Sequence, residues 1–267
     1  TKFRAKLMTI THDLISAWQQ CDLTSSPYIL PADKPYLTKY STRIFHSFDE
    51  YIANPEFGSS SDTNLHVGLL PLPFIGNLRK ATIFVLMLNP GLHPGDYYAE
   101  QYNFEYKKAC IRNLHQENNN DEYPFIFLNP QFAWHPGFEY WNKKFNPIIE
   151  TLEKQSQITY QEAMSILAKS LACLELLPYH SKSFGSNSLL KVLPSVQTMI
   201  SFVHEILLPK AKNGEILIIV TREAQNWQLP KYKNIITYEG GETCSAYLSL
   251  ASRGGKAIAN HLGLRIQ

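Results

Sequence analysis

The sequence lacks several features that would assign it quickly to a class of protein. Among its 267 residues there is no run of about 18 apolar residues, which a membrane-spanning helix would need. No apolar segment of signal-peptide length follows the charged start from Thr1 to Lys6. The four cysteines stand far apart and form no Cys-x-x-Cys pair: Cys21, Cys110, Cys173 and Cys244. We therefore expect a soluble, cytoplasmic protein with neither a disulfide framework nor a zinc knuckle.

Charge and metal-binding patterns are equally sparse. A formal net charge of +2 is too small to indicate a nucleic-acid partner by itself. His93, His135 and His180 could be combined with Asp96 into a metal site, but no His-x-His or His-x-x-x-His spacing supports one. The sequence also lacks the Gly-x-Ser-x-Gly elbow of many serine hydrolases. We expect neither a metal ion nor another cofactor.

The sequence does contain an alternation of apolar strands with amphipathic helices. The runs that predict core strands are 82–88, 171–177, 215–220 and 234–238. A capping box, Thr159-Tyr160-Gln161-Glu162, opens a helical pattern between the first and the second of these runs. This alternation predicts an α/β fold of three layers, with a mainly parallel central sheet of four or five strands flanked by helices. We expect residues 76–267 to form this domain and residues 1–75 to form a helical extension packed on it.

Local patterns predict three further features outside these strands. An amphipathic helix is expected over residues 10–20, with Thr11 as its N-cap. A second helix is expected near residues 37–51, between loops rich in proline, glycine and serine. The polar stretch over residues 97–121 is interpreted as a loop or lid.

The most informative local feature is the turn Asn89-Pro90-Gly91-Leu92, because it directly follows the apolar run 81–88. Pro90 fixes its own φ, and Gly91 permits a close approach that a Cβ would obstruct. In open α/β sheets, ligands bind beyond the carboxyl ends of the strands, where this turn places Asn89. The alternative is a simple strand-terminating turn, since all three residue types are common in turns.

Four motifs in their order along the chain resemble the uracil-DNA glycosylase superfamily, in particular its mismatch-specific and single-strand-selective branches. The first is Leu88-Asn89-Pro90-Gly91-Leu92, similar to the family's Asn-Pro-Gly motif after the first core strand. The last, Leu248 to Gly255, resembles a divergent form of its second motif, a serine-rich loop that runs into Arg-Gly and a helix. Residues 137–144 and 174–179 resemble the family's helix start and its proline-ended strand. The resemblance covers about residues 80–265.

The resemblance implies a monofunctional DNA glycosylase, in which Asn89 orients the water that attacks the sugar. The sequence departs from the family at the second motif, where Tyr247-Leu248-Ser249 stands in place of His-Pro-Ser. In the family this loop enters the minor groove, and its histidine stabilises the departing base. In several branches the second strand ends in a base-reading asparagine, whereas Pro178, Tyr179 and His180 stand there in this chain. The base that is read therefore need not be uracil.

Candidate residues for the base site follow from the chemistry of glycosidic cleavage. The transition state needs donors aimed at the departing base, and an extruded base must be held against aromatic rings. We assign catalysis to Asn89 and His180, although His180 can equally be a loop histidine bound to the backbone. The remaining candidates for the base pocket are Pro90, Gly91, Tyr97, Tyr98, Phe127, Asn129 and Tyr179. Phe132 is a further possible stacking ring, and any of these aromatic side chains could instead belong to the core.

The last segment forms a candidate DNA phosphate site. Ser252 precedes a predicted helix whose first turn contains Gly254 and Gly255, so free backbone N–H groups and the positive end of the helix dipole face outward. Ser249 adds a hydroxyl and Arg253 a positive charge. The alternative is an ordinary serine cap beside a solvated arginine.

Together these observations favour a glycosylase-like enzyme that removes a modified, mismatched or unusual base from double- or single-stranded DNA, for example a hypermodified phage base. The alternative is a protein of the same fold that binds nucleic acid or an unknown protein partner without chemistry. Formation of alkali-labile abasic sites separates the two hypotheses.

Overall fold

A computed structural model describes residues 13–39 and 44–266 of the chain, and the expected cap at Thr11 lies outside these ranges. The chain forms two compact units, and each is described by itself. The first takes in Thr1–Phe74, Leu88–Glu117 and Glu175–Ile206, and the second takes in Ile75–Met87, Asn118–Leu174 and Leu207–Gln267. The described residues before residue 75 thus group with two later segments of the chain.

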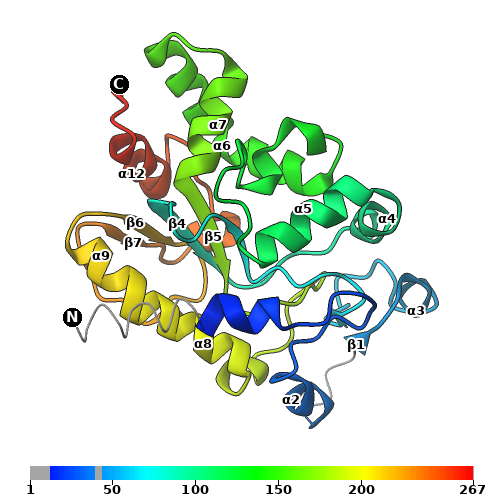
Figure 1. The fold of residues 1–267 in the computed structure, drawn as a ribbon. Coiled ribbons are helices and arrows are strands. Elements are labelled where there is room, and N and C mark those ends of the chain that lie inside the picture. The colour runs from blue at the N-terminus through cyan, green and yellow to red at the C-terminus, as the bar shows by residue number, and fades with distance from the viewer. Residues whose placement is uncertain (1–12, 40–43, 267) are drawn as a thin grey trace. The chain divides into compact units, whose positions relative to one another are not determined.

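The central feature is a five-stranded, mainly parallel sheet flanked by helices (Figure 1). Its strand order is β3-β5-β4-β6-β7. The strands are β3 (Phe74–Gly76), β4 (Ile83–Met87), β5 (Leu171–Glu175), β6 (Leu217–Val220) and β7 (Ile235–Thr237). β4 pairs with β6 in parallel, with Ile83 opposite Leu217, and β6 pairs with β7 in parallel, with Ile218 opposite Ile235. The α/β class and the sheet are confirmed.

The apolar runs of the sequence explain which segments form this sheet. Every residue of β4, β5 and β6 is buried, as expected for strands that are covered on both faces. The four predicted strands are neighbours in the sheet. The edge strand β3 was not predicted, because its three residues are too few to give a periodic pattern.

Helices of the second unit begin where the sequence provides caps. Thr159 and Glu162 form the predicted capping box at the start of α7 (Tyr160–Ser170). This helix packs against α6 (Pro136–Ser156), and α12 (Arg253–His261) packs against β6 and β7. The unit's shorter helices are η1 (Ile126–Leu128), η2 (Pro130–Phe132), α9 (Leu208–Lys212), α10 (Ala224–Trp227) and α11 (Glu242–Ser245).

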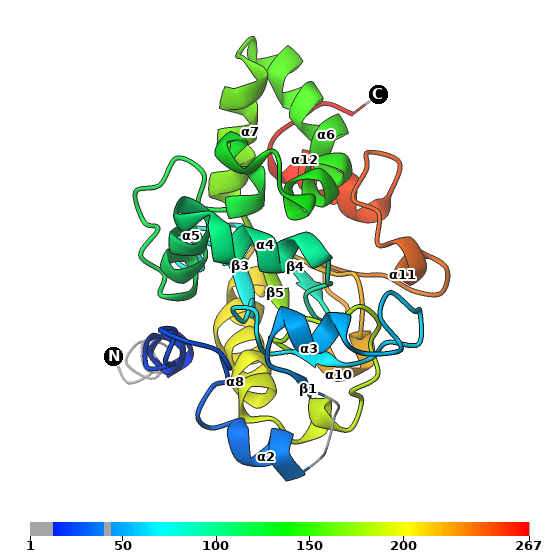
Figure 2. The same cartoon turned by 90° about the vertical axis from the view of Figure 1, so that its right-hand side faces the viewer.

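The regular structure of the first unit consists of short helices and a two-stranded sheet, β1-β2, and Figure 2 labels β1. Residues 13–19 are helical, in agreement with the predicted first helix. β1 (Ile44–Phe45) pairs in parallel with β2 (Leu65–His66). The helices after residue 19 are α2 (Lys34–Lys39), α3 (Phe48–Ile52), α4 (Pro94–Tyr102), α5 (Phe104–Leu114), η3 (Leu189–Lys191) and α8 (Pro194–Phe202), with the π-helical η4 (Val203–Leu207) at the boundary of the two units.

Two local predictions were wrong. The single helix expected over residues 37–51 is interrupted, because β1 pairs with β2. A new helix, α3, begins after Ser47, whose Oγ accepts a hydrogen bond from Glu50 N at 3.2 Å. The stretch over residues 97–121, interpreted as a loop or lid, contains most of α4 and all of α5. Their caps are His93 and Asn103, and the imidazole of His93 is an unusual cap that the sequence pattern did not indicate.

Candidate functional site

Asn89 follows β4 after one residue, and its side chain is held by three acceptors. The amide nitrogen Nδ2 donates to Ser181 Oγ at 2.8 Å, to the Tyr179 carbonyl at 3.1 Å and to the Pro90 carbonyl at 3.2 Å. These contacts fix the orientation of the amide, because exchanging its oxygen and nitrogen would place an acceptor against two carbonyl groups. Within the described part of the chain, no donor bonds Asn89 Oδ1. The carbonyl oxygen is therefore an oriented acceptor.

The segment that supplies these acceptors runs beside the Asn89 turn. Leu177 N donates to the Leu88 carbonyl at 2.9 Å, and Ser181 N donates to the Pro90 carbonyl at 3.2 Å. Backbone hydrogen bonds on both sides of Asn89 therefore hold the two segments in register. The sequence placed Asn89, Tyr179 and His180 near one another, but it gave no signal for Ser181.

His180 lies in this cluster, with both of its ring nitrogens facing backbone carbonyl groups. Nδ1 lies 2.7 Å from the Gly91 oxygen, and Nε2 lies 3.2 Å from the Leu70 oxygen. The side chain is 8% exposed. A carbonyl oxygen can only accept, so the ring acts as a donor toward the chain itself. This geometry corresponds to a histidine that holds the turn through Gly91, and it leaves neither nitrogen directed at a ligand.

Tyr179, a candidate for the base pocket, is fully buried within the first unit. Its hydroxyl donates to Asp33 Oδ2 at 2.8 Å and accepts from Leu30 N at 3.2 Å. Asp33 also accepts from Ser195 N at 3.0 Å, and its burial raises the pKa of its carboxyl group. Asp33 was missed by sequence reasoning, because it lies 146 residues from Tyr179 in a segment without a motif.

Tyr97 and Tyr98 are neighbours on α4 but have opposite environments. Tyr97 is buried, its hydroxyl lies 2.8 Å from His66 Nδ1, and its ring lies 5.3 Å from that of Phe48. Burial lowers the pKa of His66 to about 4, so this imidazole is neutral near pH 7. Tyr98 is 66% exposed, and its ring lies 4.7 Å from that of Tyr102. Of the two tyrosines, only Tyr98 presents an open ring.

Phe127 and Asn129 belong to the second unit. Phe127 is buried in η1, where its ring stacks on His135 with centroids 5.3 Å apart and an interplanar angle of 20°. Asn129 Oδ1 accepts from Gln131 N at 3.0 Å and thereby caps η2. Phe132 is also buried. All three side chains have structural roles in the unit that contains them.

The candidate phosphate site at the start of α12 is largely filled by the protein. Ser252 Oγ donates to the Ser249 carbonyl at 2.7 Å and accepts from Gly255 N at 3.0 Å. Gly255 lies so close to Ser249 that a Cβ would overlap its carbonyl oxygen. Arg253 donates to both carboxylate oxygens of Glu242, at 2.9 and 2.6 Å. A phosphate at Arg253 would therefore compete with Glu242. The DNA phosphate site at the start of α12 stays a prediction.

Gly254 is equally enclosed, since a Cβ there would overlap the hydroxyl of Tyr238. That hydroxyl also donates to the Tyr247 carbonyl. The two glycines therefore let α12 begin close against the preceding loop. This packing accounts for the Gly-Gly pair without a ligand.

Among the described residues, no group of three or more histidine, cysteine, aspartate or glutamate side chains is arranged to hold a metal ion. Within the same residues, no helix is long and apolar enough to cross a membrane.

Comparisons of the chain with protein-family models, with curated proteins and with solved structures give no match. The resemblance to the uracil-DNA glycosylase superfamily therefore depends on the sequence motifs that carry it.

Proposed function

We propose that this chain hydrolyses the N-glycosidic bond of a modified, mismatched or unusual base in DNA. The observation that carries the proposal is the fixed amide of Asn89, whose Nδ2 has three acceptors and whose Oδ1 is left to accept from a water molecule. Cleavage of this bond develops positive charge on the sugar and negative charge on the departing base. An amide oxygen that is already oriented can hold the attacking water without reorganising as the transition state forms.

Exposed aromatic and basic side chains on the two helices that follow the turn support DNA as the substrate. Tyr98, Tyr102 and Phe104 are 66, 65 and 74% exposed, an unusual degree of exposure for large rings. The Lys108 ammonium lies 5.9 Å from the centroid of the Phe104 ring. Rings of this kind stack on unpaired bases, and a nearby cation attracts the phosphate backbone.

In this proposal His180 is a positioning residue. Its contact with the Gly91 carbonyl supports the turn that carries Asn89. Base selection and the stabilisation of the departing base are then left to groups other than this ring.

The engagement of both His180 nitrogens also favours a second candidate function. Without this imidazole and without the family's second-motif histidine, the chain lacks the expected donor to the departing base. A protein with this arrangement could bind unpaired or distorted DNA without cleaving it. The experiment must therefore measure cleavage and binding separately.

A single-turnover assay on duplex and single-stranded DNA, carrying a panel of modified and mismatched bases, tests the proposal. Alkali-labile sites are expected from the wild-type chain on at least one base. Asn89→Ala should lower the rate on the order of 10²-fold or more, with nearly unchanged DNA affinity. Asn213→Ala, at an exposed position of the second unit, is the control. An unchanged rate in Asn89→Ala contradicts the assignment, and DNA binding without cleavage of any base favours the second function.

A further inference from the structure

Three large rings lie in solvent at the corner between α4 and α5, and we call them the aromatic corner: Tyr98, Tyr102 and Phe104. Tyr98 and Tyr102 are one helical turn apart on α4, and their ring centroids are 4.7 Å apart. Asn103 ends α4 and caps α5, so Tyr102 and Phe104 lie on either side of this residue, between the two helices labelled in Figure 2. All three rings therefore belong to one turn of the chain, and each keeps most of its surface open.

The two carboxyl groups of α4 add little negative charge to this corner. Asp96 Oδ2 accepts from His93 N at 2.8 Å, within the cap of the helix. Glu100 accepts from Leu70 N at 3.1 and 3.0 Å, and burial raises the pKa of its carboxyl group to about 8. Near pH 7 the carboxyl group of Glu100 is therefore mostly neutral.

The charge of α5 is positive. The helix has one acidic residue, Glu105, and three basic residues, Lys107, Lys108 and Arg112. The Lys108 ammonium is exposed and lies 5.9 Å from the centroid of the Phe104 ring. The aromatic corner therefore has a cation directly beside it, which favours an anionic partner.

The kind of side chain at the corner favours a nucleic acid over a lipid or protein surface. Every large apolar side chain of α4 and α5 that is exposed is an aromatic ring, and none is aliphatic. Flat rings stack on the faces of bases, and each stacked base contributes substantially to affinity. The faces of bases are open where a strand is unpaired, because in a duplex each base is stacked between its neighbours.

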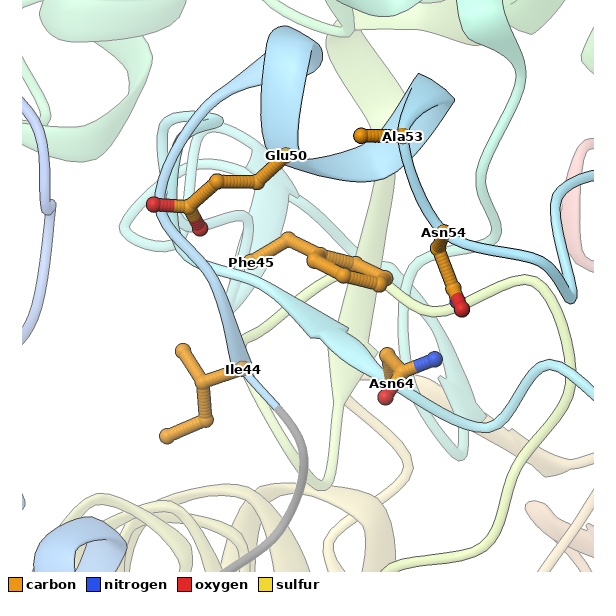
Figure 3. A pocket seen from close by; sticks show the side chains of 6 residues that line it. All are labelled: Ile44, Phe45, Glu50, Ala53, Asn54 and Asn64. Carbon is orange, nitrogen blue, oxygen red and sulfur yellow. The ribbon is translucent and has the colours of Figure 1, made fainter.

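The first unit also has a depression lined by Ile44, Phe45, Glu50, Ala53, Asn54 and Asn64 (Figure 3). Phe45 is the one ring of this lining, and Glu50 is its one charged side chain. A carboxylate repels the phosphates of a nucleic acid. The depression is therefore a poorer place for a DNA strand than the aromatic corner, where the neighbouring charge is positive.

The aromatic corner is joined to Asn89 by a short and well-fixed segment. The chain passes from Asn89 to His93, the N-cap of α4, through Pro90-Gly91-Leu92. The Gly91 carbonyl lies 2.7 Å from His180 Nδ1, and His93 Nδ1 accepts from Gly95 N at 2.9 Å. A strand stacked on α4 would therefore be held by the helix that continues directly from the Asn89 turn.

We propose that the aromatic corner stacks on unpaired bases, so that the chain binds single-stranded DNA in preference to duplex DNA. This inference rests on the proposed function, since it names the form of the DNA that the chain receives. Binding is measured separately from cleavage, so the preference for single strands and the glycosylase activity can each fail alone.

Fluorescence anisotropy of the full chain with labelled oligonucleotides of about 12 nucleotides tests the proposal. The probes are a strand of thymidines, the same strand paired with its complement, and a strand of equal length whose sugars are all abasic. The thymidine strand should bind at least about ten-fold more tightly than the other two, because the duplex hides the base faces and the abasic strand has phosphates without bases. Equal affinity for the duplex or for the abasic strand overturns the proposal, as does absence of binding.

Substitution of the rings tests whether the preference comes from this corner. Tyr98→Ala and Tyr102→Ala should each weaken binding of the thymidine strand by about ten-fold. Phe57→Ala, which removes an exposed ring beside Glu56 in the same unit, should leave the affinity unchanged. Thermal unfolding checks that the variants are folded. Unchanged affinity in both folded tyrosine variants overturns the proposal, and the comparison of probes on the wild-type chain tests it even where a variant fails to fold.

A salt titration tests the role of the neighbouring cation. Lys108→Gln should flatten the slope of log affinity for the thymidine strand against log salt concentration by about 0.7. Lys169→Gln, at an exposed position of α7, should keep the wild-type slope. Equal slopes in the two variants contradict a phosphate beside Phe104. Sedimentation with vesicles of phosphatidylserine and phosphatidylcholine tests a lipid partner, and binding of vesicles without binding of the thymidine strand overturns the proposal.

Discussion

The amide nitrogen of Asn89 lies 2.8 Å from the hydroxyl oxygen of Ser181, a residue 92 positions later in the chain. This contact differs from the two that Nδ2 makes with carbonyl groups, because it is the one that a side-chain substitution can remove. Ser181 is 3% exposed, so a water molecule cannot easily replace its hydroxyl. The orientation of Asn89 therefore depends in part on Ser181.

We expect Ser181→Ala to lower the single-turnover cleavage rate by about ten-fold while leaving DNA affinity unchanged, because a less restrained amide holds the attacking water less well. Ser181→Thr retains the hydroxyl and should recover most of the rate. The matched control is Ser183→Ala, since Ser183 Oγ donates instead to the Ser60 carbonyl at 2.8 Å. Equal rates in Ser181→Ala and Ser183→Ala would show that the Ser181 contact does not position Asn89 for catalysis.

Tyr179→Phe should lower the free energy of unfolding by about 1–3 kcal/mol, because Leu30 N loses its acceptor and Asp33 Oδ2 loses a donor in a buried site. Urea denaturation followed by circular dichroism measures this loss. Tyr247→Phe removes a hydroxyl from a side chain that is 63% exposed, and should change the stability by less than about 0.5 kcal/mol. If both variants unfold at the same urea concentration, the Tyr179 hydroxyl has no role in stability.

The sheet and the position of Asn89 could be predicted from the sequence, because long apolar runs report buried strands and a turn after such a run lies at the end of a sheet. The partners of the site residues could not be predicted in the same way. His180 contacts the carbonyl groups of Gly91 and Leu70. Because every residue has a backbone carbonyl group, the sequence does not indicate which of them a histidine ring will contact. Short elements such as β1 and β3 depend on pairing with distant segments rather than on local preference.

Glu100 should make the stability of the fold depend on pH. Burial raises the pKa of its carboxyl group from 4.5 to about 8, although hydrogen bonds from Leu70 N to both oxygens act in the opposite direction. The folded state therefore binds a proton more tightly than the unfolded state does. The resulting stabilisation is complete below about pH 4.5 and is lost as the pH rises through about 8.

The glutamine of Glu100→Gln cannot ionise. In this variant the unfolding free energy should therefore lose the decrease that ionisation of Glu100 causes between about pH 4.5 and 8. Urea denaturation at a series of pH values between about 4.5 and 8 measures the slope of the unfolding free energy against pH. Glu105→Gln, at an exposed position of α5, should keep the wild-type slope. A slope in Glu100→Gln equal to that of the wild type would contradict the raised pKa.

Gly255→Ala should lower the free energy of unfolding by about 1–3 kcal/mol, because the added Cβ would overlap the carbonyl oxygen of Ser249, a backbone atom that cannot move alone. Gly241→Ala is the matched control, since a Cβ there would have no neighbour within 4 Å and the residue has a φ of −64°. The control should be neutral or more stable by up to about 1 kcal/mol, because alanine restricts the unfolded chain. Thermal and urea unfolding of both variants make the comparison. A Gly255→Ala protein as stable as the wild type would mean that the Ser249 carbonyl does not pack against the start of α12.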